Sequence, residues 1–278
     1  MLNRRHIRIK ALQALYAYHY NPDQGLTLAE KRLRQSIEDI YLLYLYELRG
    51  LDTIREFAIE KIELNRKKRL PTEEDLEPNL RFVHNHVFQW LHSSEALHKA
   101  WDKHAITIGE NREILHRAFR DFTTSEEYQR YMSNPAKGNQ LAADKHIIKY
   151  LYAHYLTDND SLHQMYEERS MHWADDLDAA QMMLTKTIKK IGNSENTSPL
   201  QPLLKDQEDL RFAEKLLRKV IQEDQRYEEA INRRTQNWDA ERIAVIDILC
   251  MKLAIAEMTT FSQIPLKVTL NEYIELTK

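Results

Sequence analysis

The chain has 278 residues, a formal net charge of -3 and 30% charged residues, a size and composition that suit one large or two small soluble domains. Only five Gly and seven Pro leave too few turn-forming residues for a β-sandwich, a barrel or a glycine-dependent nucleotide fold. The composition therefore predicts an all-α protein. No apolar run is long enough for a membrane span, and the single cysteine favours a reducing compartment, so we expect a cytoplasmic protein.

The first helix is predicted by Ile7, Ala11 and Leu15, whose spacing is typical of an amphipathic helix, and Asn21-Pro22 should end it. Residues 1–20 hold four basic residues and no acidic one, which gives this segment +4 and the rest of the chain -7. Because the net charge alone does not favour nucleic acid, we expect any basic binding site in this segment.

Two interpretations of this helix stay open, because Arg4 and Arg8 fall inside its apolar arc. In one, the first turns extend beyond the core and form a platform for single-stranded RNA, where guanidinium groups bind phosphate and Tyr16 stacks on bases. In the other, Arg8 forms a buried ion pair with a carboxylate of a later helix, and Tyr16 and Tyr18 belong to the core.

Further along the chain, the capping box Thr27-x-x-Glu30 predicts the start of a second helix that continues towards Glu63. Pro71 and Pro78 bracket an acidic loop, and the segment 192–202 is predicted to be the least structured connection. Further helices are expected at about 80–104, 110–122, 125–132, 140–157, 161–171, 175–190, 207–233, 239–258 and from 266 to the end.

Enzymatic motifs are lacking: the sequence has no phosphate-binding glycine loop, no HExxH and no paired cysteines. The two Glu-x-x-His pairs, Glu95/His98 and Glu113/His116, resemble ligand spacing in di-iron bundles, but their number is close to chance. We therefore expect no catalytic activity, no metal site and no cofactor.

Two separated segments resemble a known family. Arg4 to Arg8 (RRHIR), followed by ALQALY at 11–16, resembles the opening of the NusB family. Asn237-Trp238, DILCMKLAIAE at 247–257 and IPLKVTLNEYIELTK at 264–278 resemble its closing helices in the same order. The middle of the chain is similar only to the long-form members.

The resemblance implies an all-α, NusB-type helical bundle enlarged by an inserted helical region. Three domains are expected. Residues 1–70 contain the basic head, by which we mean residues 1–20, residues 71–205 form the insertion, and residues 206–278 form a C-terminal bundle. Family members normally continue into one more helix with an F-x-N-G signature, so we expect this bundle to be truncated at Lys278. Trp90, Trp101 and Trp173 predict that the insertion is packed rather than disordered.

For function, the resemblance implies a non-enzymatic RNA-binding transcription antitermination factor. It would act with NusE on boxA of ribosomal RNA leader transcripts, in an RNA polymerase complex with NusA and NusG. By position, Arg4, Arg5 and Arg8 match the arginine-rich RNA motif of the family, with His6 where the family often has arginine. Together with Lys10 and Tyr16 of the same predicted helix, these residues are the RNA-binding candidates. The candidates for binding the protein partner are Asp247, Lys252, Glu257 and Lys267.

Three alternatives stay open. The chain could be the NusB-like domain of a cytosine RNA methyltransferase, or a helical scaffold without an RNA role. Asp247 could serve the fold instead of a partner, as a carboxylate paired with Arg242 or Arg8.

Overall fold

The computed structural model describes residues 1–133, 139–170, 172–192, 198–234 and 243–277. Every regular element in these ranges is a helix, which confirms the all-α prediction. No helix of this part of the chain is both long and apolar enough to cross a membrane. The chain divides into two compact units: unit 1 comprises Met1–Glu38 and Pro202–Lys278, and unit 2 comprises Asp39–Gln201. The domain boundaries that we predict from the sequence lie instead at residues 70 and 205.

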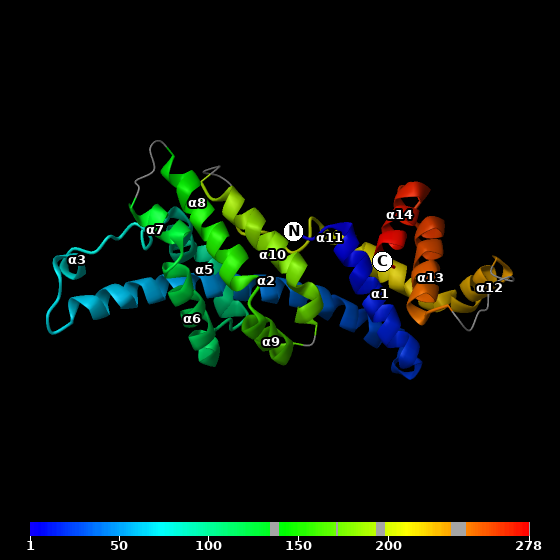
Figure 1. The fold of residues 1–278 in the computed structure, drawn as a ribbon. Helices are drawn as coiled ribbons and strands as arrows, with labels where there is room; N and C mark the ends of the chain where they lie inside the picture. The colour runs from blue at the N-terminus through cyan, green and yellow to red at the C-terminus, as the bar shows by residue number, and fades with distance from the viewer. Residues whose placement is uncertain (134–138, 171, 193–197, 235–242, 278) are drawn as a thin grey trace. The chain divides into compact units, whose positions relative to one another are not determined.

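Unit 1 combines helices from both ends of the chain (Figure 1). Its elements are α1 (Arg4–Tyr20), η1 (Pro22–Gln24), the first part of α2 (Gly25–Arg66), α11 (Gln207–Gln222), α12 (Asp224–Arg234), α13 (Val245–Thr260) and α14 (Leu266–Leu276). The first helix packs on α11 and α13, and α13 packs on α11, α12 and α14. This arrangement places the N-terminal basic segment on helices that follow it by more than 180 residues in the sequence.

The first helix begins at Arg4 and ends before Asn21-Pro22, where the sequence predicts its end. The Asn3 side chain accepts a hydrogen bond from the His6 backbone N–H at 3.0 Å, and the His6 ring Nδ1 accepts one from the Asn3 backbone N–H at 3.4 Å, which completes a capping box. Ile7, Ala11 and Leu15 are buried, as their spacing requires. The helix therefore presents its apolar stripe to the core of unit 1.

The second helix starts earlier than predicted. It begins at Gly25, directly after the short helix η1, so the expected start at Thr27-x-x-Glu30 is wrong. Glu30 instead accepts a hydrogen bond from Arg218 of α11 at 2.7 Å. The helix continues past Glu63 to Arg66, in agreement with its apolar stripe.

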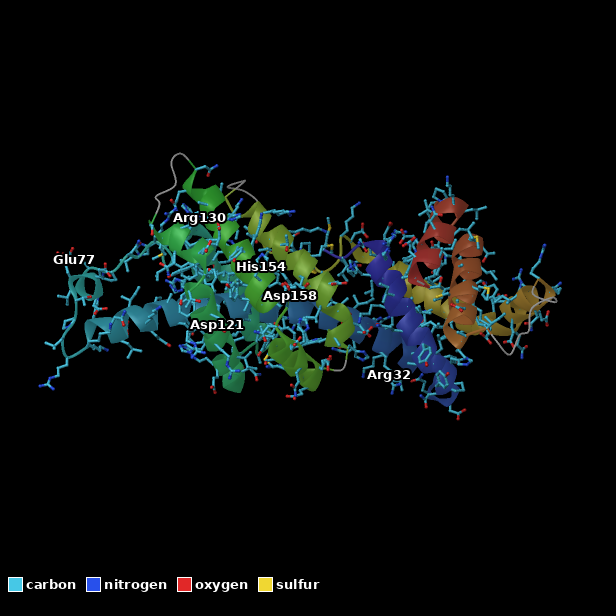
Figure 2. The ribbon with its side chains drawn as sticks, in the orientation of Figure 1. Arg32, Glu77, Asp121, Arg130, His154 and Asp158 are labelled. Atoms are coloured by element: carbon cyan, nitrogen blue, oxygen red, sulfur yellow. The ribbon has the colours of Figure 1, made fainter. Side chains whose placement is uncertain are left out.

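Unit 2 contains the rest of α2 and the helices of the central region. These are α3 (Glu73–Leu76), α4 (His86–Ser93), α5 (Glu95–Lys103), η2 (Gly109–Asn111), α6 (Arg112–Thr123), α7 (Glu126–Ser133), α8 (Gln140–Leu151), the π-helical turn η3 (Tyr152–Leu156), α9 (Asp160–Arg169) and α10 (Trp173–Lys190). Trp101 and Trp173 are buried, and the Trp101 indole donates to the Leu45 carbonyl at 2.9 Å. The prediction of a packed central region is thus confirmed. Charged side chains such as Asp121 and Arg130 lie on its surface (Figure 2).

Several helix boundaries differ from the predicted ones. The expected helix at 80–104 is two helices, because Ser94 ends α4 and its hydroxyl caps α5. The expected helix at 207–233 is also divided, at Glu223. The acidic loop contains the single turn α3, capped by Thr72. Residues 193–197 of the segment 192–202, and residues 239–242 of the predicted helix 239–258, lie outside the described residues.

Candidate nucleic-acid interface

Arg8 is buried at the centre of unit 1, where its side chain is only 4% exposed. Its guanidinium donates two hydrogen bonds to the Glu257 carboxylate of α13, at 2.8 and 2.7 Å. Burial lowers the pKa of Arg8, but the bonds to Glu257 more than offset this and leave it raised. Arg8 therefore holds α1 on α13, as the buried-ion-pair interpretation predicts, and it is not available to contact RNA in this conformation.

Glu257 is the acceptor at which this arrangement converges. Its side chain is fully buried, and besides Arg8 it accepts hydrogen bonds from the Thr269 hydroxyl at 2.9 Å and the Tyr273 hydroxyl at 3.2 Å. Thus α1, α13 and α14 meet at one carboxylate. Because it is buried, Glu257 is a packing residue in this structure rather than part of an accessible partner surface.

Arg4 and Arg5 stay accessible at the start of α1, although each has a carboxylate partner. The Arg4 side chain is 38% exposed and lies 3.3 Å from Asp209, while Arg5 is 47% exposed and makes two bonds to Glu272, at 3.0 and 3.1 Å. Hydrogen bonding from Arg5 lowers the pKa of Glu272 and keeps it ionised. Both guanidiniums keep a solvent-facing side that could bind a phosphate.

The other residues of α1 that we expect to bind RNA differ in their exposure to solvent. Lys10 is fully buried, so the expected RNA contact from it is not available in this structure. His6 serves in the capping box, and its ring is half-buried. Tyr16 is 42% exposed and packs on Tyr20 with ring centroids 5.0 Å apart, so the expectation that it belongs to the core is wrong, and Tyr18 is only half-buried. Tyr16 and Tyr20 lie about 18 and 24 Å along α1 from Arg4, so arginines and rings occupy opposite ends of the helix.

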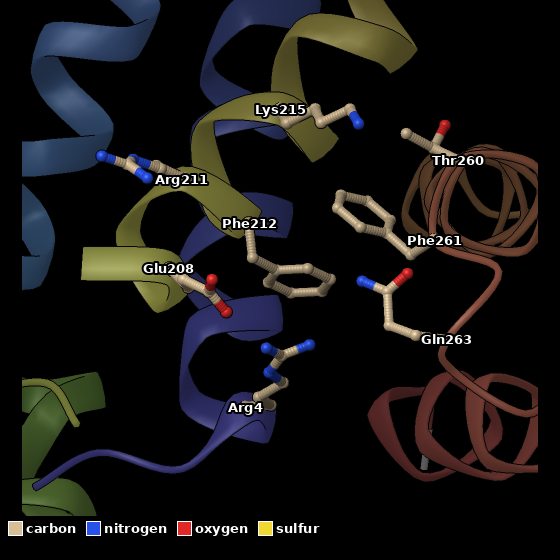
Figure 3. Close-up of a pocket in the computed structure, with 8 residues that line it drawn as sticks. All are labelled: Arg4, Glu208, Arg211, Phe212, Lys215, Thr260, Phe261 and Gln263. Carbon is tan, nitrogen blue, oxygen red and sulfur yellow. The ribbon is translucent and has the colours of Figure 1, made fainter. Parts of the chain in front are cut away.

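A surface hollow of about 250 Å³ opens beside Arg4 (Figure 3). The Arg4 guanidinium lies 4.8 Å from the ring centroid of Phe212, and the Lys215 ammonium lies 5.3 Å from that of Phe261. Arg211 and Gln263 also line it. The basic residues on α11 extend the basic head, and the sequence showed α11 only as a charged helix, because nothing in the local pattern places it beside Arg4.

The remaining residues expected to bind a protein partner differ in access. Lys252 is buried and bonds Asp224 at 2.6 Å and Glu228 at 3.1 Å, so it ties α13 to α12. Lys267 is exposed on α14. Asp247 is half-buried at the edge of a hollow of about 520 Å³ between α13 and α14.

Asp247 does not pair with Arg8, whose partners are Glu257 and Glu272, so that alternative is wrong. Arg242, the other expected partner of Asp247, lies outside the described residues.

The Glu-x-x-His pairs of unit 2 have other roles. His98 contacts the Leu91 carbonyl at 3.1 Å, and the His116 ring packs edge-on against Phe57 at 4.9 Å. In the described part of the chain, no group of three His, Cys, Asp or Glu side chains is arranged to hold a metal ion.

Comparison of the sequence with known proteins shows similarity to one family. Residues 177–278 match the model of the NusB family. The chain is 35% identical over 77 residues to a transcription antitermination protein NusB of Salinibacter ruber, covering 28% of this chain and 48% of that protein. The relative from Chloroherpeton thalassium is 40% identical over 67 residues, covering 24% of this chain and 32% of that protein.

A third relative is covered more completely. The NusB of Bacillus licheniformis is 33% identical over 88 residues, which is 32% of this chain and 68% of that protein. The match thus spans half or less of the first two relatives and two thirds of the third. No solved structure matches the chain. The family model and the Bacillus relative together show that this chain belongs to the NusB family.

Proposed function

We propose that this protein is a non-enzymatic, RNA-binding transcription antitermination factor. The observation that carries the proposal is the position of Arg4 and Arg5: their accessible guanidiniums lie at the end of α1, in the same unit as α11, α13 and α14 of the family-matching segment. Such groups bind phosphate in single-stranded RNA. The curated relatives are named transcription antitermination proteins, which supports the same role.

The first test removes both accessible arginines. We expect the double variant Arg4→Ala, Arg5→Ala to bind a single-stranded boxA-like RNA about tenfold more weakly at moderate salt, because two phosphate contacts are lost. The salt dependence of log affinity should become shallower by roughly 1.4, at ~0.7 per contact. Fluorescence anisotropy over a salt series measures both quantities.

Its control removes two arginines from the same unit. Arg226 and Arg233 of α12 have side chains 71% and 70% exposed, so the variant Arg226→Ala, Arg233→Ala causes the same change of net charge. We expect it to bind RNA like the wild type. Equal affinity of the two double variants would contradict the assignment of the head.

We also propose NusE as the protein partner, boxA as the RNA element, and NusA, NusG and RNA polymerase as the larger complex. The surface that we assign to NusE is the α13–α14 face, where Asp247 and Lys267 are accessible and Leu270 and Ile274 are about half exposed. Because phosphate contacts position RNA without reading its sequence, a second protein would supply the missing specificity.

The expected result is that NusE tightens boxA binding by more than tenfold, a coupling of at least ~1.4 kcal/mol. Calorimetry of NusE with the protein, and anisotropy of labelled boxA with and without NusE, measure this coupling. We expect Asp247→Ala to lower the affinity for NusE that calorimetry measures, while the exposed control Glu229→Ala on α12 leaves this affinity unchanged. The absence of any complex would contradict the NusE proposal and favour the methyltransferase or scaffold alternatives.

A further inference from the structure

The exposed face of α11 carries a line of basic residues beyond Arg4. The hollow beside Arg4 adjoins a second one of about 370 Å³, and the two share Arg211 and Lys215. We name the two together the α11 groove. Its charged lining residues are Arg4, Arg211, Lys215, Arg218, Lys219, Glu208 and Glu214. This lining has a formal charge of +3, although the whole chain has -3.

The helical spacing explains why these residues form a line. Arg211, Lys215 and Arg218 are four and three residues apart, so they share one face of the helix. The opposite face holds Ala213 and Val220, which are buried in unit 1. Burial of that face fixes the direction of the basic one, and Gln222 ends the line about 16 Å from Arg211.

Of the four cations that α11 contributes to the groove, two have a carboxylate partner and two do not. Arg218 bonds Glu30 at 2.7 Å, and Lys219 bonds Glu223 at 2.9 Å. Arg211 has no ion pair among the residues that the structure describes, and Lys215 faces the Phe261 ring instead of an acid.

Two acidic residues line the groove, Glu208 in the hollow beside Arg4 and Glu214 further along α11, and they offset two of its five positive charges. Glu214 already pairs with Arg34 of α2. The unpaired positive charge of the groove therefore lies on Arg211 and Lys215, next to Arg4.

We propose that the α11 groove is the track along which single-stranded RNA continues from the head, with its phosphates on Arg211 and Lys215. This inference rests on the proposed RNA-binding function and names the path of the strand. Single-stranded RNA is flexible and carries one negative charge per nucleotide, so its phosphates can follow a straight line of cations. The rings of Phe212 and Phe261 are only 3% and 6% exposed, so bases do not stack there, and the groove adds affinity rather than sequence preference.

The test compares three double variants of the full chain. They are the groove variant Arg211→Ala, Lys215→Ala, the head variant Arg4→Ala, Arg5→Ala, and the α12 control Arg226→Ala, Arg233→Ala. The probe is a fluorescein-labelled single-stranded RNA of about 12 nucleotides and mixed sequence, within the site sizes of such proteins. We expect the groove variant to bind about tenfold more weakly, with a salt slope shallower by roughly 1.4, and the control to match the wild type.

The outcomes separate the inference from the proposed function. If the head variant loses affinity and the groove variant matches the control, the inference is wrong and the proposed function stands. If the wild-type protein does not bind the RNA, both are wrong. If excess polyglutamate competes as well as unlabelled RNA and the groove variant loses both, the groove binds an acidic protein and the RNA track is overturned.

A single variant guards against misfolding. Arg211→Ala removes a side chain without an ion pair among the described residues, so its circular dichroism spectrum should equal that of the wild type. It should bind RNA about threefold more weakly, with half the change in salt slope. Wild-type affinity in this well-folded variant would also overturn the inference.

Discussion

Replacing Arg8 with alanine should lower the free energy of unfolding of unit 1 by ~3–5 kcal/mol, the usual cost of removing one partner from a buried ion pair. The Glu257 carboxylate would stay buried with the Thr269 and Tyr273 hydroxyls but without its cation. Urea unfolding followed by circular dichroism, with hydrogen exchange of α1 and α13, measures the loss.

The matched control is Arg5→Ala, which removes an arginine one helical turn away. Its pair with Glu272 is exposed to solvent, so the unfolding midpoint should stay close to that of the wild type. If Arg8→Ala unfolds at the same urea concentration as Arg5→Ala, the central role of the buried pair is refuted. The comparison also shows why Arg8 variants are unsuitable for mapping RNA contacts: they would weaken binding through the fold.

Unit 2 should lose stability as the pH rises, because of the buried carboxyl group of Glu47. Burial raises its pKa to about 8 from 4.5, and the nearby Tyr152 hydroxyl offsets this only in part. Between these values the unfolded chain has an ionised Glu47 while the folded chain keeps it protonated, so unfolding releases a proton. Stability should therefore fall through this window, at ~1.4 kcal/mol per pH unit and by on the order of 5 kcal/mol in all.

The variant Glu47→Gln tests this origin, because glutamine keeps the size of the side chain and cannot ionise. We expect it to be no more stable than the wild type at pH 5 and clearly more stable at pH 8. Fluorescence of Trp173, which lies against Tyr46 in the same core, follows the unfolding of unit 2. The exposed control Glu63→Gln should lose stability with rising pH as the wild type does. If the free energy of unfolding of Glu47→Gln falls with pH as steeply as that of the wild type, Glu47 is not the source of the effect.

The sequence predicted most of the helices because local signals define them. The spacing of Ile7, Ala11 and Leu15 and the Asn21-Pro22 terminus were enough to place α1. The break at Ser94 was missed although serine is a favoured capping residue, because the apolar pattern continues across it. The division at Glu223 has no such signal, since no Gly or Pro stands there.

The candidate site was less predictable, since its geometry depends on contacts across the whole chain. The helical wheel showed that Arg8 falls in the apolar arc, but only the fold shows that its partner is Glu257, 249 residues later. Similarly, Arg211 and Lys215 have an ordinary exposed pattern for a charged helix. Only the packing of α1 on α11 brings them next to Arg4.

The order in which the chain is synthesised gives the Arg8–Glu257 pair a further consequence. Proteins are made from the N-terminus, so α1 emerges from the ribosome long before its partners α13 and α14 exist. Residues 39–201 emerge in between and can fold as a unit before unit 1 can close. The arginine-bearing helix should therefore dock last, and an interrupted translation product would carry an intact unit 2 but no assembled unit 1.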